Sequence, residues 1–261
     1  MFITDGNQLT NSIVGIIRKI LKNSPFYNGA SNLYHHFKLV SMRVALYRSG
    51  VKYLPPLSMG GEYKSQYGQD YYLEKLGLIG DKGFFVEVGC NDPIFNSNSH
   101  YLETVLGWSG VAIDGIDYSA QYADLRKRTI FINILIDENE GYSEFYEVRD
   151  VTGWENQVSS VYKETLKMSK GFEADIKKIK SMPLRLIKEI NRPIDLCLID
   201  VEGHEFSVLR SINWKIQKPK IFVIENNGQF YSRKMLVEFM IEKGYKHIAR
   251  IGTSDDIFSI I

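Results

Sequence analysis

The chain has 261 residues and a formal net charge of +1, and 44% of its residues are hydrophobic and 24% charged. These fractions are typical of a globular protein, and the length allows one α/β domain with an appendage. The near-neutral charge excludes a whole-protein attraction to nucleic acid, and no apolar run approaches the roughly 20 residues needed to cross a bilayer.

Two features of the sequence indicate a cytoplasmic protein. The N-terminus lacks the basic stretch, apolar core and cleavage site of a signal peptide. The two cysteines, Cys90 and Cys197, are too few for a disulfide framework, and both lie in segments that we predict to be buried. We therefore expect two core thiols in a reducing compartment.

Residues 1–58 are predicted to form a helical, basic appendage. Apolar residues recur at helical spacing over residues 13–21, and a second helix is expected over Leu33–Tyr47. The charged residues of the appendage are basic except for Asp5. A basic amphipathic helix can lie on the inner face of an anionic membrane. Its apolar stripe can equally pack on the rest of the chain, which is the interpretation we favour.

The run Phe84–Val88 is predicted to be a strand buried on both faces, because its β-forming residues show no regular polar alternation. It contains Glu87 and is followed by Gly89, Asn91 and Asp92. A glycine lets the backbone approach a ligand that a Cβ would block. An adjacent acid suits a cationic or hydroxyl-bearing cofactor, whereas a dinucleotide site has a G-x-G-x-x-G run. The segment therefore predicts a ligand-binding loop.

Further predicted strands also finish in a carboxylate. Asp114 ends the run 110–114, close to the spacing expected for an acid that binds ribose hydroxyls. Asp200 and Glu225 end two later apolar runs. Because ligands bind at the carboxyl ends of the strands in open α/β sheets, these acids and Glu87 predict one shared site.

A long insertion is predicted before the strand that ends at Asp200, at about residues 148–182. Segments of this length often form functional lids, and its lysine-rich part, Lys163–Lys180, is predicted to be helical. Three more elements are expected: a helix over Met182–Ile190, a helix over Lys234–Lys243 and an antiparallel hairpin of residues 245–250 and 257–261.

A set of short motifs resembles the FkbM-type methyltransferases. The motifs are Ser65–Asp70, Phe85–Asp92, Ser97–Ser99, Gly107–Val111, Ile199–Glu205, Gly244–Tyr245 and Asp256–Phe258. Their fixed order makes the resemblance more specific than a single glycine motif. Two positions depart from the family pattern, which usually has Gly at Pro93 and Pro at Gly115. Because Pro93 fixes φ and lacks an N–H donor, the loop is expected to differ in shape there.

The resemblance implies a Rossmann-like class I methyltransferase fold over residues 59–261. This α/β fold has a mostly parallel seven-stranded sheet with helices on both faces. The implied cofactor is S-adenosylmethionine, and the implied acceptor is a sugar hydroxyl of a glycan, glycolipid or glycosylated natural product. The expected cofactor residues are Glu87 and Gly89 near the methionine part, Asn91 and Asp92 in the same loop, Asp114 at the ribose, Asn133 near the adenine and Gln66 over the methionyl carboxylate.

Methyl transfer to oxygen requires the hydroxyl proton to leave, so a general base or a divalent ion is needed. Asp200, Glu225 and Asn226 offer oxygen ligands at adjacent strand ends, which suits Mg²⁺ or Mn²⁺. The arrangement is similar to that of catechol O-methyltransferases. Alternatively, Glu225 and Asn226 only cap the following helix, just as Ser65 could cap the helix after it.

His204 is the predicted general base, because an imidazole has a pKa suited to proton transfer near neutrality. It shares a short loop with Asp200 and Glu202, which we also assign to the catalytic site. Glu202 and Glu205 are alternatives to His204 as the base. Either glutamate could instead orient His204 or help to hold the metal.

Two other functions are compatible with the sequence. A non-catalytic carbohydrate- or membrane-binding protein on a methyltransferase scaffold is kept open by Pro93, whereas Glu87, Gly89, Asp114 and Asp200 oppose it. A nicotinamide-dependent oxidoreductase is opposed by the missing glycine fingerprint. We expect a saccharide or glycoconjugate as the partner and no nucleic acid, and an oligomer is compatible with the sequence.

Overall fold

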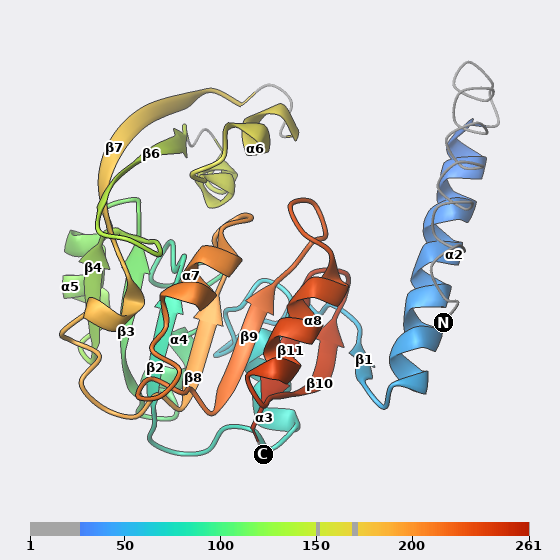
Figure 1. Cartoon of the computed structure of the whole chain (residues 1–261), viewed down its shortest axis with the longest axis horizontal. Coiled ribbons are helices and arrows are strands. Elements are labelled where there is room, and N and C mark those ends of the chain that lie inside the picture. The colour runs from blue at the N-terminus through green and yellow to red at the C-terminus, as the bar shows by residue number, and fades with distance from the viewer. Residues whose placement is uncertain (1–26, 150–151, 169–171, 261) are drawn as a thin grey trace. The chain divides into compact units, whose positions relative to one another are not determined.

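The computed structural model describes residues 27–149, 152–168 and 172–260. The chain divides into two compact units, Met1–Gly50 and Val51–Ile261. In the first unit, helix α2 (Tyr27–Arg48) confirms the helix expected over Leu33–Tyr47 (Figure 1). The helix expected over residues 13–21 lies outside the described residues.

Helix α2 combines basic charge with exposed apolar side chains. It contains no acidic residue. Its exposed large hydrophobic side chains recur at helical spacing, at Phe37, Val40, Val44 and Tyr47. None of the described helices is both long and apolar enough to span a membrane.

An eight-stranded sheet forms the centre of the second unit (Figure 1). Its order is β1 (Lys52–Leu54), β10 (Lys246–Ile251), β11 (Asp255–Ser259), β9 (Ile221–Glu225), β8 (Leu196–Ile199), β2 (Phe84–Val88), β3 (Ser109–Asp114) and β4 (Thr129–Asn133). Only β11 runs antiparallel to its neighbours in this sheet. The mostly parallel sheet and the C-terminal hairpin are therefore confirmed. The sheet exceeds the seven strands expected, because residues that we assigned to the appendage form β1 beside β10.

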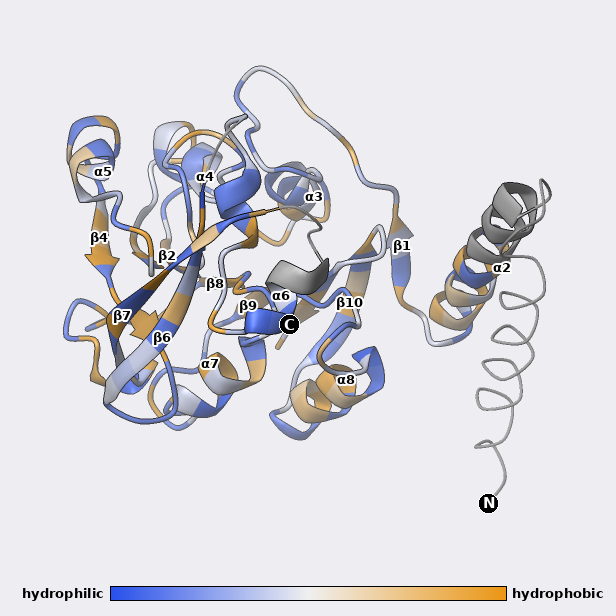
Figure 2. Cartoon of the chain, turned by 90° about the horizontal axis from the view of Figure 1, so that it is seen from above, coloured by the Kyte–Doolittle hydropathy of each residue, from blue (hydrophilic) through white to orange (hydrophobic). Residues whose placement is uncertain are grey.

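Helices cover both faces of this sheet, as expected. Every residue of β2 is buried, and successive side chains enter different cores, with Val86 on one face and Phe85 on the other. The helices α7 (Glu205–Ser211) and α8 (Arg233–Glu242) contribute to the first core, whereas α3 (Gln69–Lys75) and α4 (His100–Thr104) contribute to the second. In Figure 2 the central strands are among the most hydrophobic segments. This burial on both faces explains the apolar run of β2.

The insertion contributes the strand β7 to a second sheet. Its order is β5 (Leu135–Ile136), β7 (Ala174–Met182) and β6 (Gly141–Val148). The strands β6 and β7 extend above the ends of the parallel strands (Figure 1). The prediction of a helix over Lys163–Lys180 is wrong beyond α6 (Lys163–Met168), because residues 174–181 pair with β6 along its whole length. Long-range pairing has overridden the local helical preference of the lysines.

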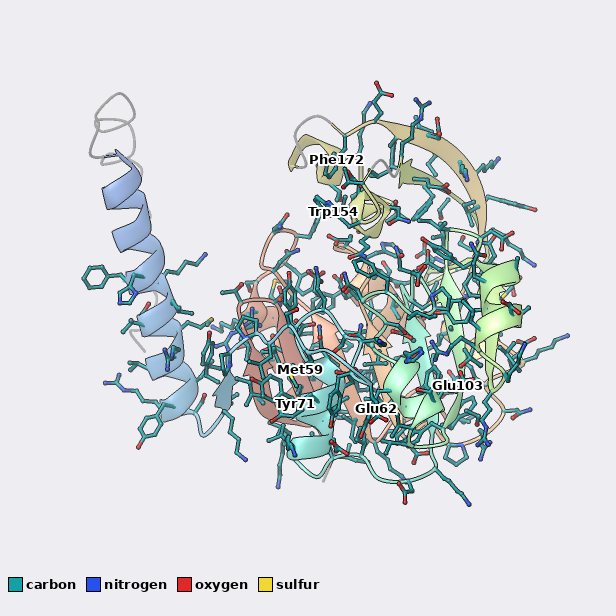
Figure 3. All side chains as sticks on the ribbon, turned by 180° about the vertical axis from the view of Figure 1, so that it is seen from behind. Met59, Glu62, Tyr71, Glu103, Trp154 and Phe172 are labelled. Atoms are coloured by element: carbon teal, nitrogen blue, oxygen red, sulfur yellow. The ribbon has the colours of Figure 1, made fainter. Side chains whose placement is uncertain are left out.

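The helix expected over Met182–Ile190 is also absent, and η2 (Leu184–Leu186) is a single 3₁₀ turn. Leu184, Ile187 and Ile190 are buried in the first core, and their spacing of three imitates a helical pattern. The insertion also contains the short 3₁₀ helix η1 (Glu155–Val158). Next to it, the rings of Trp154 and Phe172 are in contact, with centroids 5.6 Å apart (Figure 3).

Candidate active site

A cavity with an open volume of about 880 Å³ lies at the carboxyl ends of the parallel strands. Residues that follow β2, β3 and β8 form its floor, and residues 156, 157 and 159–161 of the insertion form one wall. The strand-end rule therefore located the cavity correctly from the sequence.

The loop after β2 enters this cavity at Gly89 and Asn91. Gly89 has φ +80°, and a Cβ there would lie 1.6 Å from the carbonyl oxygen of Asp200. We expected a glycine here to let the backbone approach a ligand. The structure gives a further reason, because the backbone after β8 fills the space that a Cβ of residue 89 would need. Asn91 has φ +48°, and its Oδ1 accepts hydrogen bonds from the Asp92 N–H and the Tyr118 hydroxyl.

Asp114 lines the cavity at the end of β3. Its Oδ2 accepts the Asn91 N–H at 2.8 Å, and its Oδ1 accepts the Ile116 N–H at 2.8 Å. Burial raises the pKa of the Asp114 carboxyl to about 6, although these N–H donors oppose the shift. Since each carboxylate oxygen has two acceptor positions, both can still accept a hydroxyl hydrogen from a ligand.

The wall beside Asp114 is mainly apolar. Its residues are Ile116, Ile134, Leu135, Ile136 and Phe145. A flat aromatic ring would bury apolar surface there. The prediction that Asn133 contacts such a ring is not supported, because Asn133 does not line the cavity. Its Nδ2 donates to the Asp114 and Gly115 carbonyls, so it holds the loop that carries Asp114.

Three other expected cofactor residues occupy different positions. Glu87 is 2% exposed and does not line the cavity, and its burial raises its carboxyl pKa to about 7. Asp92 also lies outside the lining, since its Oδ1 accepts the Ile94 and Phe95 N–H groups and shapes the loop. Gln66 does line the cavity, together with the buried Gln69. Of the three, only Gln66 lines the cavity.

Ser65 is not the N-cap residue of α3, because that position is Gly68. Its hydroxyl hydrogen-bonds the Asp70 carboxylate, and its Oγ also accepts the Asp70 N–H in the first turn of α3 at 3.3 Å. The alternative role of Glu225 and Asn226 as helix caps is likewise wrong. The cap of α8 is Ser232, whose Oγ accepts the Met235 N–H at 3.3 Å.

Three carboxylates converge where β8 and β9 end. Asp200, Glu202 and Glu225 each offer an oxygen within 4.8 Å of the others, an arrangement that could hold a metal ion. The predicted third ligand, Asn226, is buried, and its Oδ1 accepts the Gly228 N–H at 2.9 Å. The third carboxylate of the group is therefore Glu202 rather than Asn226. We had assigned Glu202 to catalysis and had named it as a residue that could help to hold the metal.

Burial and mutual repulsion raise the pKa values of this acidic group. Burial and then the charge of Glu202 raise the pKa of Asp200 well above its usual range, and burial and then Asp200 do the same for Glu225. Burial and then Glu205 raise the pKa of Glu202 to about 7. Three carboxylates this close favour protonation or a bound hard cation such as Mg²⁺.

His204 lines the cavity from the loop after β8, with its side chain 13% exposed. Its Nδ1 lies 3.3 Å from the Tyr162 hydroxyl, and its Nε2 lies 3.6 Å from Asp137 Oδ1. Burial lowers the pKa of the imidazole, so the neutral ring prevails at neutral pH. The Glu205 carboxylate holds the backbone of this loop, since its Oε1 accepts the Val201 and Gly203 N–H groups.

The insertion links the two sides of the cavity. In the loop after β2, Asn96 Nδ2 donates to Gln157 Oε1 at 3.0 Å. At the loop after β8, the Ser160 hydroxyl donates to the Glu202 carbonyl at 3.0 Å. Sequence reasoning missed these partners and Tyr162, because nothing in a polar insertion indicates which of its side chains return to the site.

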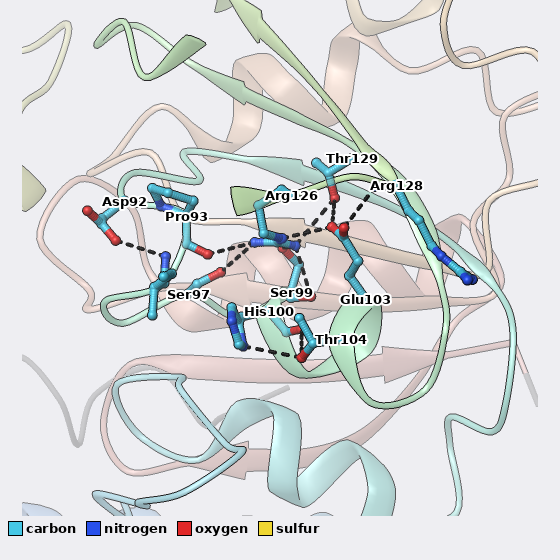
Figure 4. Close-up of polar contacts among 11 residues, drawn as sticks. Asp92, Pro93, Ser97, Ser99, His100, Glu103, Thr104, Arg126, Arg128 and Thr129 are labelled. Atoms are coloured by element: carbon cyan, nitrogen blue, oxygen red, sulfur yellow. Dashed lines mark hydrogen bonds and ion pairs between the residues drawn. The ribbon is translucent and has the colours of Figure 1, made fainter. Parts of the chain in front are cut away.

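A buried arginine supports the loop after β2 (Figure 4). The Arg126 guanidinium donates to the Pro93 carbonyl at 2.8 Å, to Ser99 Oγ at 2.9 Å and to Glu103 Oε2 at 2.8 Å. Its side chain is 0% exposed. Pro93 can therefore replace the usual glycine without loss of the loop, because its carbonyl still has a strong donor.

A family model described as the Methyltransferase FkbM domain matches residues 87–247. No curated protein matches the chain. Among solved structures, a provisionally named rRNA-methylase from Clostridium thermocellum is 11% identical, with 78% of this chain and 97% of that chain covered and a TM-score of 0.40. The precorrin-6y C5,15-methyltransferase from Geobacter metallireducens GS-15 is also 11% identical, with 78% and 93% covered and a TM-score of 0.35.

Proposed function

The chain belongs to the FkbM methyltransferase family, and on that premise we propose that it methylates a sugar hydroxyl with S-adenosylmethionine as the methyl donor. The acceptor would belong to a glycan, a glycolipid or a glycosylated natural product. The observation that carries this proposal is the cavity at the strand ends, which combines Asp114 with an acidic group and His204.

The cavity residues suit the parts of S-adenosylmethionine. The Asp114 carboxylate can accept ribose hydroxyls, and the apolar wall with Leu135 and Phe145 can pack on the adenine. Gln66 and Asn91 supply polar groups on the side toward β2. When bound, this cofactor supplies an electrophilic methyl group on a sulfonium. The chain itself must orient the acceptor and remove its proton.

We assign proton removal to His204, the neutral imidazole at the cavity wall. Asp200 and Glu202 lie on the same side and can orient the acceptor hydroxyl. A hard cation held by these acids and Glu225 would lower the pKa of a bound hydroxyl. Mg²⁺ and Mn²⁺ fit an all-oxygen donor set of this kind.

The non-catalytic alternative drew its support from Pro93. That residue lies in a loop fixed by Arg126, and the cavity beside the loop has room for a ligand. No feature of the described residues favours a purely binding function over methyl transfer, so we propose the enzyme alone.

Mass spectrometry of cell-surface glycans and glycolipids tests the acceptor class. Cells that contain the protein should yield a methylated saccharide that is missing from cells without it, and the His204→Ala variant should restore little of it. The variant should lower turnover by roughly 10²–10⁴, the range for a positioned acid–base group. Identical glycans in both cells, combined with methylation of a non-saccharide substrate, would contradict the sugar assignment.

A further inference from the structure

Two side chains from distant parts of the chain flank the imidazole of His204. Asp137, directly after β5, has its Oδ1 3.6 Å from Nε2. Tyr162, in the insertion, has its hydroxyl 3.3 Å from Nδ1. The two ring nitrogens therefore face chemically different partners, and neither partner belongs to the loop that carries His204.

The chemistry of these partners selects one tautomer of the ring. The distance of 3.6 Å between Nε2 and Asp137 Oδ1 is too long for a hydrogen bond. A carboxyl oxygen at this distance still attracts an N–H and repels a ring lone pair, so it favours the hydrogen on Nε2. A neutral imidazole then has its lone pair on Nδ1. The Tyr162 hydroxyl can donate to that lone pair, so the three residues form a consistent set.

Both partners are themselves held in place. The Asp137 N–H donates to the Met182 carbonyl at 3.1 Å, and Asp137 Oδ1 also accepts the Glu138 N–H at 2.7 Å. The Tyr162 ring stacks on Phe230 with centroids 5.0 Å apart, and it meets the His204 ring edge-on at 5.7 Å.

The loop of His204 is fitted closely against the same aromatic pair. A Cβ at Gly203 would lie 2.3 Å from the Phe230 ring. The loop therefore cannot move toward Phe230 without a clash, and the position of the imidazole is defined from several sides. Groups that orient a histidine in this way fix both its tautomer and its direction.

We propose that Asp137 and Tyr162 are positioning residues that hold His204 as its Nε2–H tautomer, with Nδ1 as the atom that receives the acceptor's proton. The inference rests on the proposed function, in which His204 is the base. The acceptor O–H bond breaks as its oxygen bonds to the methyl carbon, the bond from that carbon to the sulfonium sulfur breaks, and Nδ1 keeps the proton. Before the acceptor binds, the Tyr162 hydroxyl donates to Nδ1 and holds the ring. Because Nδ1 has a single lone pair, the Tyr162 O–H must rotate away when the acceptor hydroxyl binds, while the Tyr162 ring stays stacked on Phe230.

Nitrogen-15 NMR of the histidine rings in the full chain tests the tautomer without any turnover. Spectra are recorded at a pH well above the ordinary imidazole pKa, and the loss of signals in His204→Gln identifies the ring. The wild-type ring should have a protonated Nε2 and a bare Nδ1. In Asp137→Asn the new amide can donate to Nε2, so the Nδ1–H tautomer should become populated.

Glu138→Gln is the matched control, because it removes a neighbouring carboxylate that makes no hydrogen bond to the ring. Its spectrum should match that of the wild type. Tyr162→Phe should leave Nε2 protonated and shift the Nδ1 signal toward that of a nitrogen without a hydrogen-bond donor. A wild-type ring protonated at Nδ1, or an Asp137→Asn ring with an unchanged tautomer, would overturn the inference.

Kinetics separate this inference from the function on which it rests. Asp137→Asn should lower kcat by roughly 10²–10⁴ through the wrong tautomer, with the KM for the cofactor unchanged. Loss of kcat with the tautomer change supports the inference. A changed tautomer with wild-type kcat would overturn the role of His204 as the base, whereas the NMR result alone decides what Asp137 does.

Discussion

Asp114 is a buried carboxylate whose environment makes its charge depend on pH near neutrality. It accepts two backbone N–H groups and has its pKa raised to about 6, with burial as the main cause. A ribose hydroxyl binds the ionised form more strongly, because that form only accepts hydrogen bonds. The affinity for the cofactor should therefore be highest above pH 6.

We expect the affinity of the wild type for S-adenosylmethionine to fall as the pH drops from 7 through about 6, the pKa of Asp114. The limit is about tenfold for each pH unit. Asp114→Asn should bind more weakly at pH 7 and lack this step, and Asp114→Ala should lose about 1.5–3 kcal/mol of binding free energy. Calorimetric titrations from pH 8 to 5 measure both effects. A pH step of the same size in Asp114→Asn would assign it to another group.

The acidic group of Asp200, Glu202 and Glu225 has pKa values raised by burial and mutual repulsion. A hard cation would relieve this repulsion, so Mg²⁺ or Mn²⁺ should raise the Tm of the wild type but not that of Asp200→Asn. Chelation should abolish turnover with little change in cofactor affinity, and either ion should restore it. Full activity in excess chelator would show that turnover needs no metal ion and that His204 removes the proton alone.

The segment from Pro93 to α4 depends on one buried side chain. Arg126 is fully buried, pairs with Glu103 and donates to the Pro93 carbonyl (Figure 4). Arg126→Met should lower the free energy of unfolding by about 3–5 kcal/mol, because it leaves the buried Glu103 carboxylate without its cation. Urea denaturation measures this change.

Arg128→Met is the matched control for this element. Its guanidinium is exposed and donates to the Gly107 carbonyl at 2.9 Å. We expect Arg128→Met to lower the free energy of unfolding by no more than about 0.5 kcal/mol. Equal losses in the two variants would mean that the buried ion pair does not stabilise the loop. A large loss in Arg126→Met alone would agree with our interpretation of Pro93.

Elements governed by local or strand-end patterns could be predicted from the sequence. The buried run of β2, the hairpin of β10 and β11, and the class I methyltransferase fold are confirmed. β7 could not be predicted, because its partner β6 lies far away in the sequence and its exposed lysines imitate a solvated helix.

The site residues divide in the same way, into those that a strand-end pattern predicts and those that only tertiary contacts bring to the site. Asp114 and Asp200 end parallel strands, so the strand-end rule places them at the cavity. Asn133 also ends a strand, but its amide is engaged by two backbone carbonyls, which no sequence pattern reveals. Asp137 and Tyr162 reach His204 through tertiary contacts. Those contacts follow from the path of the insertion, which pairs β7 with both β5 and β6.

At the scale of the whole molecule, every residue that lines the cavity belongs to the second unit, Val51–Ile261. Removing residues 1–50 should therefore leave the affinity for the cofactor within about twofold of the wild type, which calorimetry can measure. If the basic appendage packs on the rest of the chain, as we favour from the sequence, and thereby encloses the substrate, its removal should raise the KM for the acceptor. A truncated chain that keeps the acceptor KM but no longer sediments with anionic vesicles would instead support membrane binding.

The central claim is that the cavity binds S-adenosylmethionine, and one calorimetric titration of the full chain with this cofactor tests it most directly. We expect a single site with a Kd of roughly micromolar magnitude, equivalent to about −8 kcal/mol, and weaker binding by Asp114→Ala. A folded protein that shows neither binding heat nor a thermal shift with the cofactor would contradict the account.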